Sequence, residues 1–146
     1  MSDPKHLYPE GAGDPHESQN ASFDNDFSRE VIGAAVEVQK VLGVGLLESA
    51  YAGALAHEMT LRGLSFEREV PVDAVYKGVK VGPGYQADFI VEGSLVIELK
   101  TVEAVADAHK AQLLSCLRLS GLKLGLLINF GVFPVVRGVH RVANKL

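Results

Sequence analysis

The sequence lacks most of the features that mark secreted, membrane-spanning and zinc-binding proteins. Cys116 is the single cysteine among the 146 residues, which excludes an intrachain disulfide and a cysteine-based zinc cluster. No apolar run approaches the roughly 18–20 residues needed to span a bilayer. The first residues show neither the basic nor the apolar segment of a signal peptide. We therefore expect a cytoplasmic protein with no membrane segment.

Aromatic residues are also scarce. There is no tryptophan, and aromatic residues make up 7% of the chain. The sequence contains no zinc finger, helix-turn-helix or aromatic base-stacking motif of the kind that reads nucleic-acid sequence. Specificity for a particular nucleic-acid sequence is therefore not predicted.

Acidic residues are missing from the last part of the chain. No Asp or Glu follows Asp107, whereas six lysines and arginines do. Residues 1–30 hold seven acids and two bases, a net charge of −5, so the overall charge of −4 comes from this N-terminal part. The basic C-terminal part could attract phosphate groups, or its lysines and arginines could simply be solvated. Charge alone leaves both interpretations open.

The hydrophobic pattern predicts an acidic leader followed by one folded domain. Residues 1–25 have no hydrophobic period and are expected to be disordered, and residues 26–146 are long enough for one domain. Helical spacing predicts helices over residues 28–42, 46–62 and 104–120, the first capped by Asp26 or Ser28. Strands are predicted over residues 65–75, 79–81, 85–91, 95–101, 123–130 and 134–142. This order belongs to the α/β (α+β) class.

Two of the helices have apolar stripes that we expect to be buried. The stripe of the second helix consists of Leu47, Tyr51, Leu55 and Met59. The stripe of the third helix consists of Ala108, Ala111, Leu114 and Leu117.

One group of charged residues interrupts otherwise apolar strands. Asp88 is followed after nine residues by Glu98-Leu99-Lys100. Strand alternation places Glu98 and Lys100 on one face, and a turn at residues 92–94 forms a hairpin that brings Asp88 beside them. Two carboxylates and an ammonium are costly to bury, and Mg²⁺ or Mn²⁺ bound to both carboxylates would offset that cost.

Lys100 would then orient the attacking water or stabilise charge on a phosphate. The alternative is an ordinary charged strand whose side chains are solvated or paired. The apolar neighbours of these residues indicate a central strand, where charged side chains are unfavourable unless a partner compensates them. They therefore favour the metal site.

Several further segments carry a resemblance to a known family. In chain order they are Gly45-Leu-Leu-Glu48-Ser-Ala-Tyr51, Glu69-Val70-Pro71-Val72, Tyr76-Lys77-Gly78, Ala87-Asp88-Phe89, Ile97-Glu98-Leu99-Lys100-Thr-Val-Glu103, Gln112-Leu-Leu and Gly125-Leu-Leu-Ile-Asn129-Phe130-Gly131. Together they cover about residues 28–142 and resemble the bacterial GxxExxY family, which is similar to the PD-(D/E)xK, or restriction-endonuclease-like, nucleases. The resemblance implies an αβββαβ core with a central mixed sheet flanked by helices. It also implies divalent-metal-dependent cleavage of nucleic acid at Asp88, Glu98 and Lys100.

The resemblance implies two more site residues, Glu48 as a further metal ligand and Gln112 as a catalytic-site residue on the following helix. A carboxylate such as Glu48 is also favourable at a helix N-terminus for dipole reasons alone. The Gln112 amide stands in an apolar helix, where a buried amide needs a partner. Tyr51 lies on the same helix face as Glu48 and either orients it or fills the core.

The remaining candidates receive structural interpretations. We expect His109 at the surface rather than facing the site, and Glu103 to be a solvated loop acid. Cys116 is expected to be a small core residue, and Asn129 to fix the turn that follows its strand.

The sequence therefore predicts a metal-dependent nuclease that hydrolyses phosphodiester bonds with Mg²⁺ or Mn²⁺. DNA is favoured over RNA as the substrate, and a homodimer is left open. One alternative is a catalytically inactive nucleic-acid- or protein-binding module on the same fold. Another is a regulatory oligomer in which the C-terminal strand completes a shared sheet.

Overall fold

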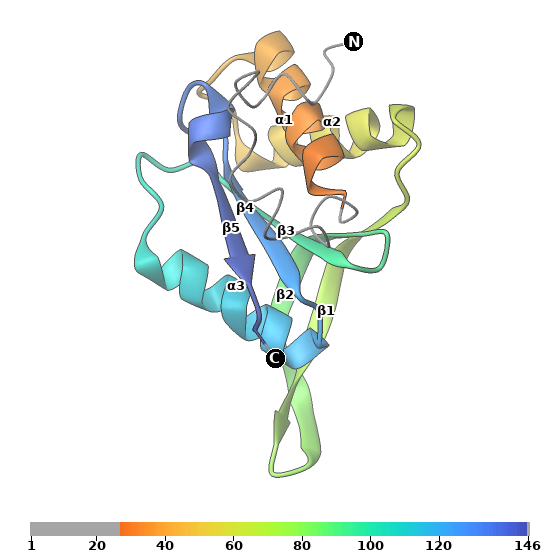
Figure 1. Cartoon of the computed structure of the whole chain (residues 1–146). Helices are drawn as coiled ribbons and strands as arrows, with labels where there is room; N and C mark the ends of the chain where they lie inside the picture. Colours follow the sequence, from red (N-terminus) through yellow and green to blue (C-terminus); the bar gives the residue numbers. More distant parts are fainter. Residues whose placement is uncertain (1–26, 146) are drawn as a thin grey trace.

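The computed structural model describes residues 27–145, which form helices on both sides of a five-stranded sheet (Figure 1). The acidic leader expected over residues 1–25 lies outside this range. The helices are α1 (Ser28–Leu42), α2 (Glu48–Leu61) and α3 (Asp107–Ser120). The strands are β1 (Phe66–Tyr76), β2 (Val79–Val91), β3 (Leu95–Lys100), β4 (Leu124–Asn129) and β5 (Val139–Ala143), and a 3-10 turn, η3 (Val135–Gly138), precedes β5.

The sheet has the strand order β1-β2-β3-β4-β5. Only β3 and β4 are parallel to each other, and α3 is the crossover between them. The predicted α+β class and the αβββαβ core with a mixed sheet are confirmed, and β3 is the central strand, as its apolar flanks indicated. Within residues 27–145, no helix is long and apolar enough to cross a membrane.

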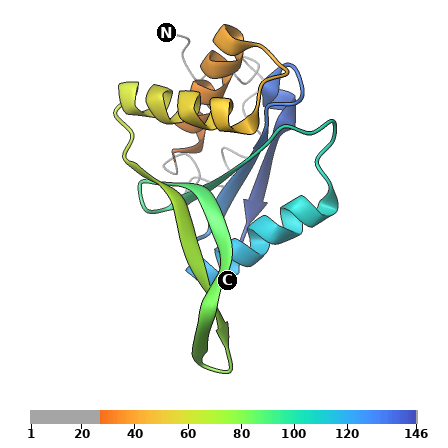
Figure 2. The same cartoon turned by 180° about the vertical axis from the view of Figure 1, so that it is seen from behind.

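The buried side chains form two clusters, one on each face of the sheet. The first cluster joins α1 and α2 to the sheet, and the second joins α3 to its other face. Figure 2 shows α3 packed along the sheet away from the two other helices. Leu95, Ile97 and Leu99 belong to the first cluster and Val96 to the second. Alternation along β3 therefore directs Glu98 and Lys100 toward the α3 face.

Helix α3 packs closely on β4 at Gly125. A Cβ atom on Gly125 would lie 2.9 Å from Leu113 Cδ1, so the leucine occupies the space that a larger residue would need. The stripe predicted for this helix was largely wrong: its buried residues are Leu113, Cys116 and Leu117. The missing side chain of Gly125 admits Leu113, and this contact sets the rotation of the helix in a way that α3's own sequence does not reveal.

The stripe predicted for α2 is confirmed at Tyr51, Leu55 and Met59, which are fully buried. Leu47 is instead 78% exposed. It is the N-cap residue with extended backbone angles, so its side chain does not follow the helical repeat.

The two strands predicted over residues 79–81 and 85–91 are a single strand, β2, that runs through Pro83-Gly84. In this part of the sheet β2 pairs with β1 alone. A strand with one open side tolerates the missing N–H of a proline. The break that proline usually marks therefore does not occur.

The strand predicted over residues 134–142 begins late, because the 3-10 turn η3 comes first. The buried side chain of Gln39 on α1 holds the preceding loop. Its Nε2 donates to Val132 O at 2.7 Å, and its Oε1 accepts a hydrogen bond from Val135 N–H at 2.7 Å. The loop is therefore bound to α1 instead of extending β5.

Two predicted helix starts also differ. Phe27, with φ 67°, is the N-cap of α1, and a phenylalanine has no side-chain acceptor. Ser28 is the first helical residue rather than the cap, and Asp26 lies outside the described range. Helix α3 begins at Asp107 because His109 Nδ1 accepts a hydrogen bond from Ala106 N–H at 3.1 Å just before it.

We predict opposite effects of alanine at two glycines. Gly125→Ala should lower the free energy of unfolding by about 1–3 kcal/mol, because Leu113 must move away from the new methyl group. Gly53→Ala is the control: a Cβ at this position in α2 meets nothing within 4 Å. This change should stabilise the chain by about 0.5–1 kcal/mol. Denaturant unfolding measures both, and equal effects would contradict the packing described for α3.

Candidate active site

The site lies where β2 separates from β3. The two strands pair over three residues each, ending at Phe89 opposite Ile97. β3 then continues beside β4 as far as Lys100, whereas β2 stays with β1 alone. Asp88 and Glu98 are the first residues beyond the last pair on their strands. The divergence therefore opens the sheet between two carboxylates.

The Asp88 side chain replaces the backbone hydrogen-bond partner that β3 loses where β2 moves away. Asp88 Oδ2 accepts a hydrogen bond from Leu99 N–H at 2.7 Å. The carboxylate thus occupies the position where a regular ladder would place a backbone carbonyl. The prediction that the hairpin brings Asp88 beside the Glu98–Lys100 segment agrees with this contact.

At Asp88 the side chains of β2 also change the face of the sheet to which they point. Phe89 packs in the α1/α2 cluster and Ala87 in the α3 cluster, although alternate residues of a regular strand share a face. Glu69, which lies between the β1 partners of these two residues, has φ 52°. A left-handed residue within an extended strand interrupts the regular alternation of faces, while β1 and β2 remain paired on both sides of it. Ala87 and Tyr85, which precede Asp88 on β2, therefore face α3.

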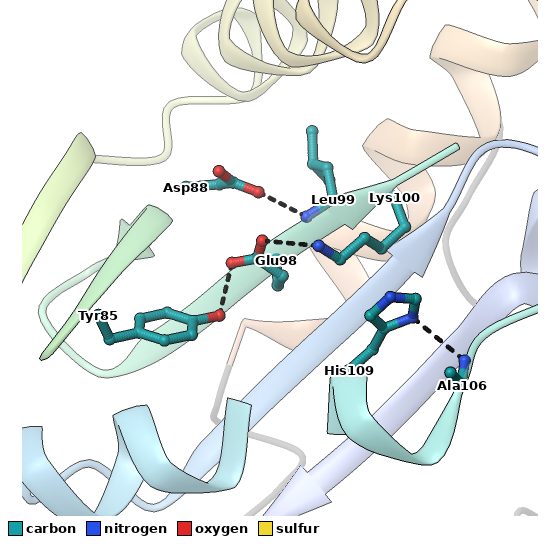
Figure 3. Close-up of polar contacts among 7 residues, drawn as sticks. All are labelled: Tyr85, Asp88, Glu98, Leu99, Lys100, Ala106 and His109. Carbon is teal, nitrogen blue, oxygen red and sulfur yellow. Dashed lines mark hydrogen bonds and ion pairs between the residues drawn. The ribbon is translucent and has the colours of Figure 1, made fainter. Parts of the chain in front are cut away.

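This change of face brings Tyr85 to Glu98 (Figure 3). Tyr85 Oη donates a hydrogen bond of 2.6 Å to Glu98 Oε2. On the other side of the carboxylate, Lys100 Nζ lies 3.7 Å from Glu98 Oε1. Glu98 is therefore held between a hydroxyl donor and an ammonium, and both its oxygens face charged or polar groups.

The surroundings of Glu98 disfavour its charged form. Burial raises its pKa to about 7, and the neighbouring Asp88 carboxylate acts in the same direction. The Tyr85 hydroxyl and the Lys100 ammonium act in the opposite direction, favouring the charged form. Two carboxylates this close in a partly desolvated place are stabilised by positive charge.

Glu48 lies beside this pair as the first residue of α2. Although its side chain is exposed, partial burial raises its pKa. The Asp88 carboxylate raises this pKa further and the Lys100 ammonium lowers it, so Glu48 lies within electrostatic reach of both. The two interpretations of Glu48 as a site neighbour and as a helix N-terminal acid are therefore compatible.

Tyr51 is a core residue that fixes the loop in front of Glu48. Its ring stacks on Phe130 with centroids 4.6 Å apart. Its hydroxyl donates to Gly43 O at 2.7 Å and accepts from Leu46 N–H at 3.3 Å. Tyr51 therefore orients the backbone that enters α2, and the hydrogen bonds of its hydroxyl go to this loop.

Gln112 is exposed, so the expectation of a buried amide that needs a partner was wrong. The helix rotation set by Leu113 turns Gln112 outward. It still lies one turn before Cys116 on α3, and residues at that spacing share a side of a helix. Burial raises the pKa of the Cys116 thiol to about 11, and the charge of Glu98 adds to the effect. A role of Gln112 at the site therefore stays a prediction.

The other candidates have structural roles. Half-buried His109 caps α3 through its hydrogen bond with Ala106, and Glu103 is exposed, as expected. Cys116 is buried in the α3 cluster. Asn129 Oδ1 accepts from Gly131 N–H at 2.9 Å, as predicted for the turn, and its amide also pairs with both backbone groups of Val102.

Tyr85 was not predicted as a site residue. It precedes Asp88 by three residues, and regular alternation would place the two on opposite faces. Only the change of face at Asp88 brings the tyrosine to Glu98. A positive φ at Glu69 has no sequence signal, so this contact could not be anticipated.

The donors of the site fit a hard divalent cation such as Mg²⁺. Within residues 27–145 no cluster of three or more His, Cys, Asp and Glu side chains converges on one point. Mg²⁺ is usually held by one or two carboxylates together with water and substrate phosphate, and Asp88 and Glu98 supply such a pair. Their mutual repulsion and partial burial would be offset by a bound cation.

One comparison with known proteins found a match. A sequence profile described as the PD-(D/E)XK nuclease superfamily matches residues 25–142. Searches of curated proteins and of solved structures found no match.

We predict that Tyr51→Phe destabilises the chain by about 1–3 kcal/mol, because Gly43 O and Leu46 N–H lose their common partner while the ring stacking is kept. Tyr76→Phe is the matched control, since Tyr76 is 52% exposed near the end of β1. This change should stay within about 0.5 kcal/mol. Thermal unfolding compares them, and a neutral Tyr51→Phe would show that the loop does not depend on the hydroxyl.

Proposed function

This chain belongs to the PD-(D/E)XK nuclease superfamily, and we propose that it is a metal-dependent nuclease with Asp88, Glu98 and Lys100 as its active site. Superfamily membership implies a nucleic-acid substrate. One observation carries the assignment. Where β2 and β3 diverge, two carboxylates and an ammonium lie together, and Glu98 is only 13% exposed.

In this proposal Asp88 and Glu98 bind Mg²⁺ or Mn²⁺, the ions that suit carboxylate oxygens. When bound, the cation supplies Lewis-acid chemistry for phosphodiester hydrolysis. Asp88 is held through Oδ2 and Glu98 through Oε2, so these two hydrogen bonds do not involve Asp88 Oδ1 and Glu98 Oε1. The Lys100 ammonium orients the attacking water or stabilises negative charge on the phosphate.

Glu48 and Gln112 complete the proposed site from two helices. Glu48 adds a third carboxylate as a supporting ligand, consistent with its electrostatic coupling to Asp88 and Lys100. Gln112 is exposed on α3, and in this proposal its amide contacts the substrate.

Within the superfamily we assign the chain to the GxxExxY group. The residues of that motif have connected roles here: Gly45 has φ 92° in the loop before α2, Tyr51 ties the loop down, and Glu48 follows it. We also propose DNA rather than RNA as the substrate. Because one site cuts one strand, action on both strands of a duplex would suit a homodimer.

In keeping with the distribution of charge along the chain, we also propose an acidic leader over residues 1–25 and a single domain over residues 26–146. We further propose that the protein acts in the cytoplasm. The second candidate function is a binding module that keeps this fold without turnover. It is favoured by the absence of a convergent three-ligand metal cluster within the described part of the chain. Tight binding with no cleavage across single- and double-stranded DNA and RNA would support it.

We predict that the purified chain cleaves nucleic acid with Mg²⁺ or Mn²⁺ and that Glu98→Gln and Lys100→Ala each reduce the rate by at least about 10²-fold, as expected for groups that stabilise charge at the reacting centre. Lys80→Ala is the control, because the Lys80 side chain is 78% exposed on β2. Circular dichroism establishes that the variants are folded. Activity that survives both Lys100→Ala and Asp88→Asn would refute the site.

Gln112→Ala separates a substrate contact from a structural role. Since the side chain is exposed, the free energy of unfolding should change by less than about 0.5 kcal/mol. Cleavage at low substrate concentration should nevertheless slow. If Gln112 binds substrate, KM should rise while kcat stays nearly unchanged. Unchanged kinetics would remove Gln112 from the site.

A further inference from the structure

Tyr85 makes the shortest polar contact of the site. Its hydroxyl lies 2.6 Å from Glu98 Oε2, within the range of a charge-assisted O–H···O⁻ hydrogen bond. The ring is partly buried in the α3 cluster. The donor is therefore held by packing and does not depend on Glu98 for its position.

The contact determines how Glu98 presents its carboxylate. A glutamate has three rotatable side-chain bonds, and burial of its aliphatic part alone would not fix the carboxylate plane. With Oε2 bound to Tyr85, Oε1 is turned toward Lys100 Nζ. Asp88 is fixed in the same way, through Oδ2 on Leu99 N–H.

We propose that Tyr85 is a positioning residue that orients the Glu98 carboxylate for a divalent cation. The proposal rests on the function proposed above, because it takes Asp88 and Glu98 as the ligands. Removing a residue that hydrogen-bonds to a metal-binding carboxylate or histidine typically lowers metal affinity or activity about 10- to 100-fold. Tyr85 would act on the cation through Glu98 and not by direct ligation.

The test is a titration of the full chain with Mn²⁺ alone, followed by electron paramagnetic resonance. Tyr85→Phe removes the donor and keeps the ring, and we expect it to weaken Mn²⁺ binding about tenfold. Tyr76→Phe, which removes an exposed tyrosine hydroxyl, should bind Mn²⁺ like the wild-type chain. Circular dichroism and thermal unfolding check that each variant is folded.

A double-mutant cycle tests whether the effect passes through Glu98. In a Glu98→Gln background, Tyr85→Phe should no longer change Mn²⁺ affinity. The same loss in both backgrounds would overturn the proposal, as would a Tyr85→Phe variant that unfolds at a lower temperature but binds Mn²⁺ normally.

The outcomes also separate this proposal from the nuclease assignment. A wild-type chain that binds Mn²⁺, loses affinity with Tyr85→Phe and cleaves nothing would leave Tyr85 in its role and remove the nuclease. A wild-type chain that cleaves nucleic acid, and whose Mn²⁺ affinity is unchanged by Tyr85→Phe, would support the nuclease and remove the role of Tyr85. No Mn²⁺ binding by the wild-type chain would overturn the role of Tyr85 together with the metal ligands.

Discussion

The hydrogen bond from Leu99 N–H to the Asp88 carboxylate allows the sheet to open without leaving this backbone N–H unpaired. A β-ladder that ends in the middle of a sheet exposes donors and acceptors, and unpaired buried groups are costly. Here the Leu99 N–H is bound by Asp88, the side chain that we propose as a metal ligand. The opening of the sheet and the position of the Asp88 carboxylate therefore depend on the same hydrogen bond.

Other side chains around the site do the same for their own backbone segments. Asn129 pairs with Val102 just beyond β3, Gln39 holds the loop after β4, and Tyr51 holds the loop before α2. Each replaces ladder or helix hydrogen bonds where regular structure stops. These neutral, buried side chains thus fix loops that regular structure leaves without backbone partners.

The sequence was sufficient for whatever depends on local periodicity. It predicted the helices, the buried β4, the turn after Val91 and the shared face of Glu98 and Lys100, because these follow from spacing within one element. It failed where a distant partner decides. The rotation of α3 depends on the gap at Gly125, and Tyr85 reaches Glu98 only because the side chains of β2 change face at Asp88. Neither the rotation of α3 nor the contact of Tyr85 with Glu98 can be recognised from the residues of α3 or β2 alone.

The hairpin of β1 and β2 projects beyond the rest of the fold in both views (Figure 1, Figure 2). Its tip is a two-residue turn, Lys77-Gly78, in which both residues have positive φ. Exposed turns of this kind tolerate inserted sequence, and this one lies nine residues along β2 from Asp88. A fluorophore, affinity tag or fused domain placed there would report on the protein, or tether it, at roughly 30 Å from the carboxylates, at about 3.3 Å per strand residue.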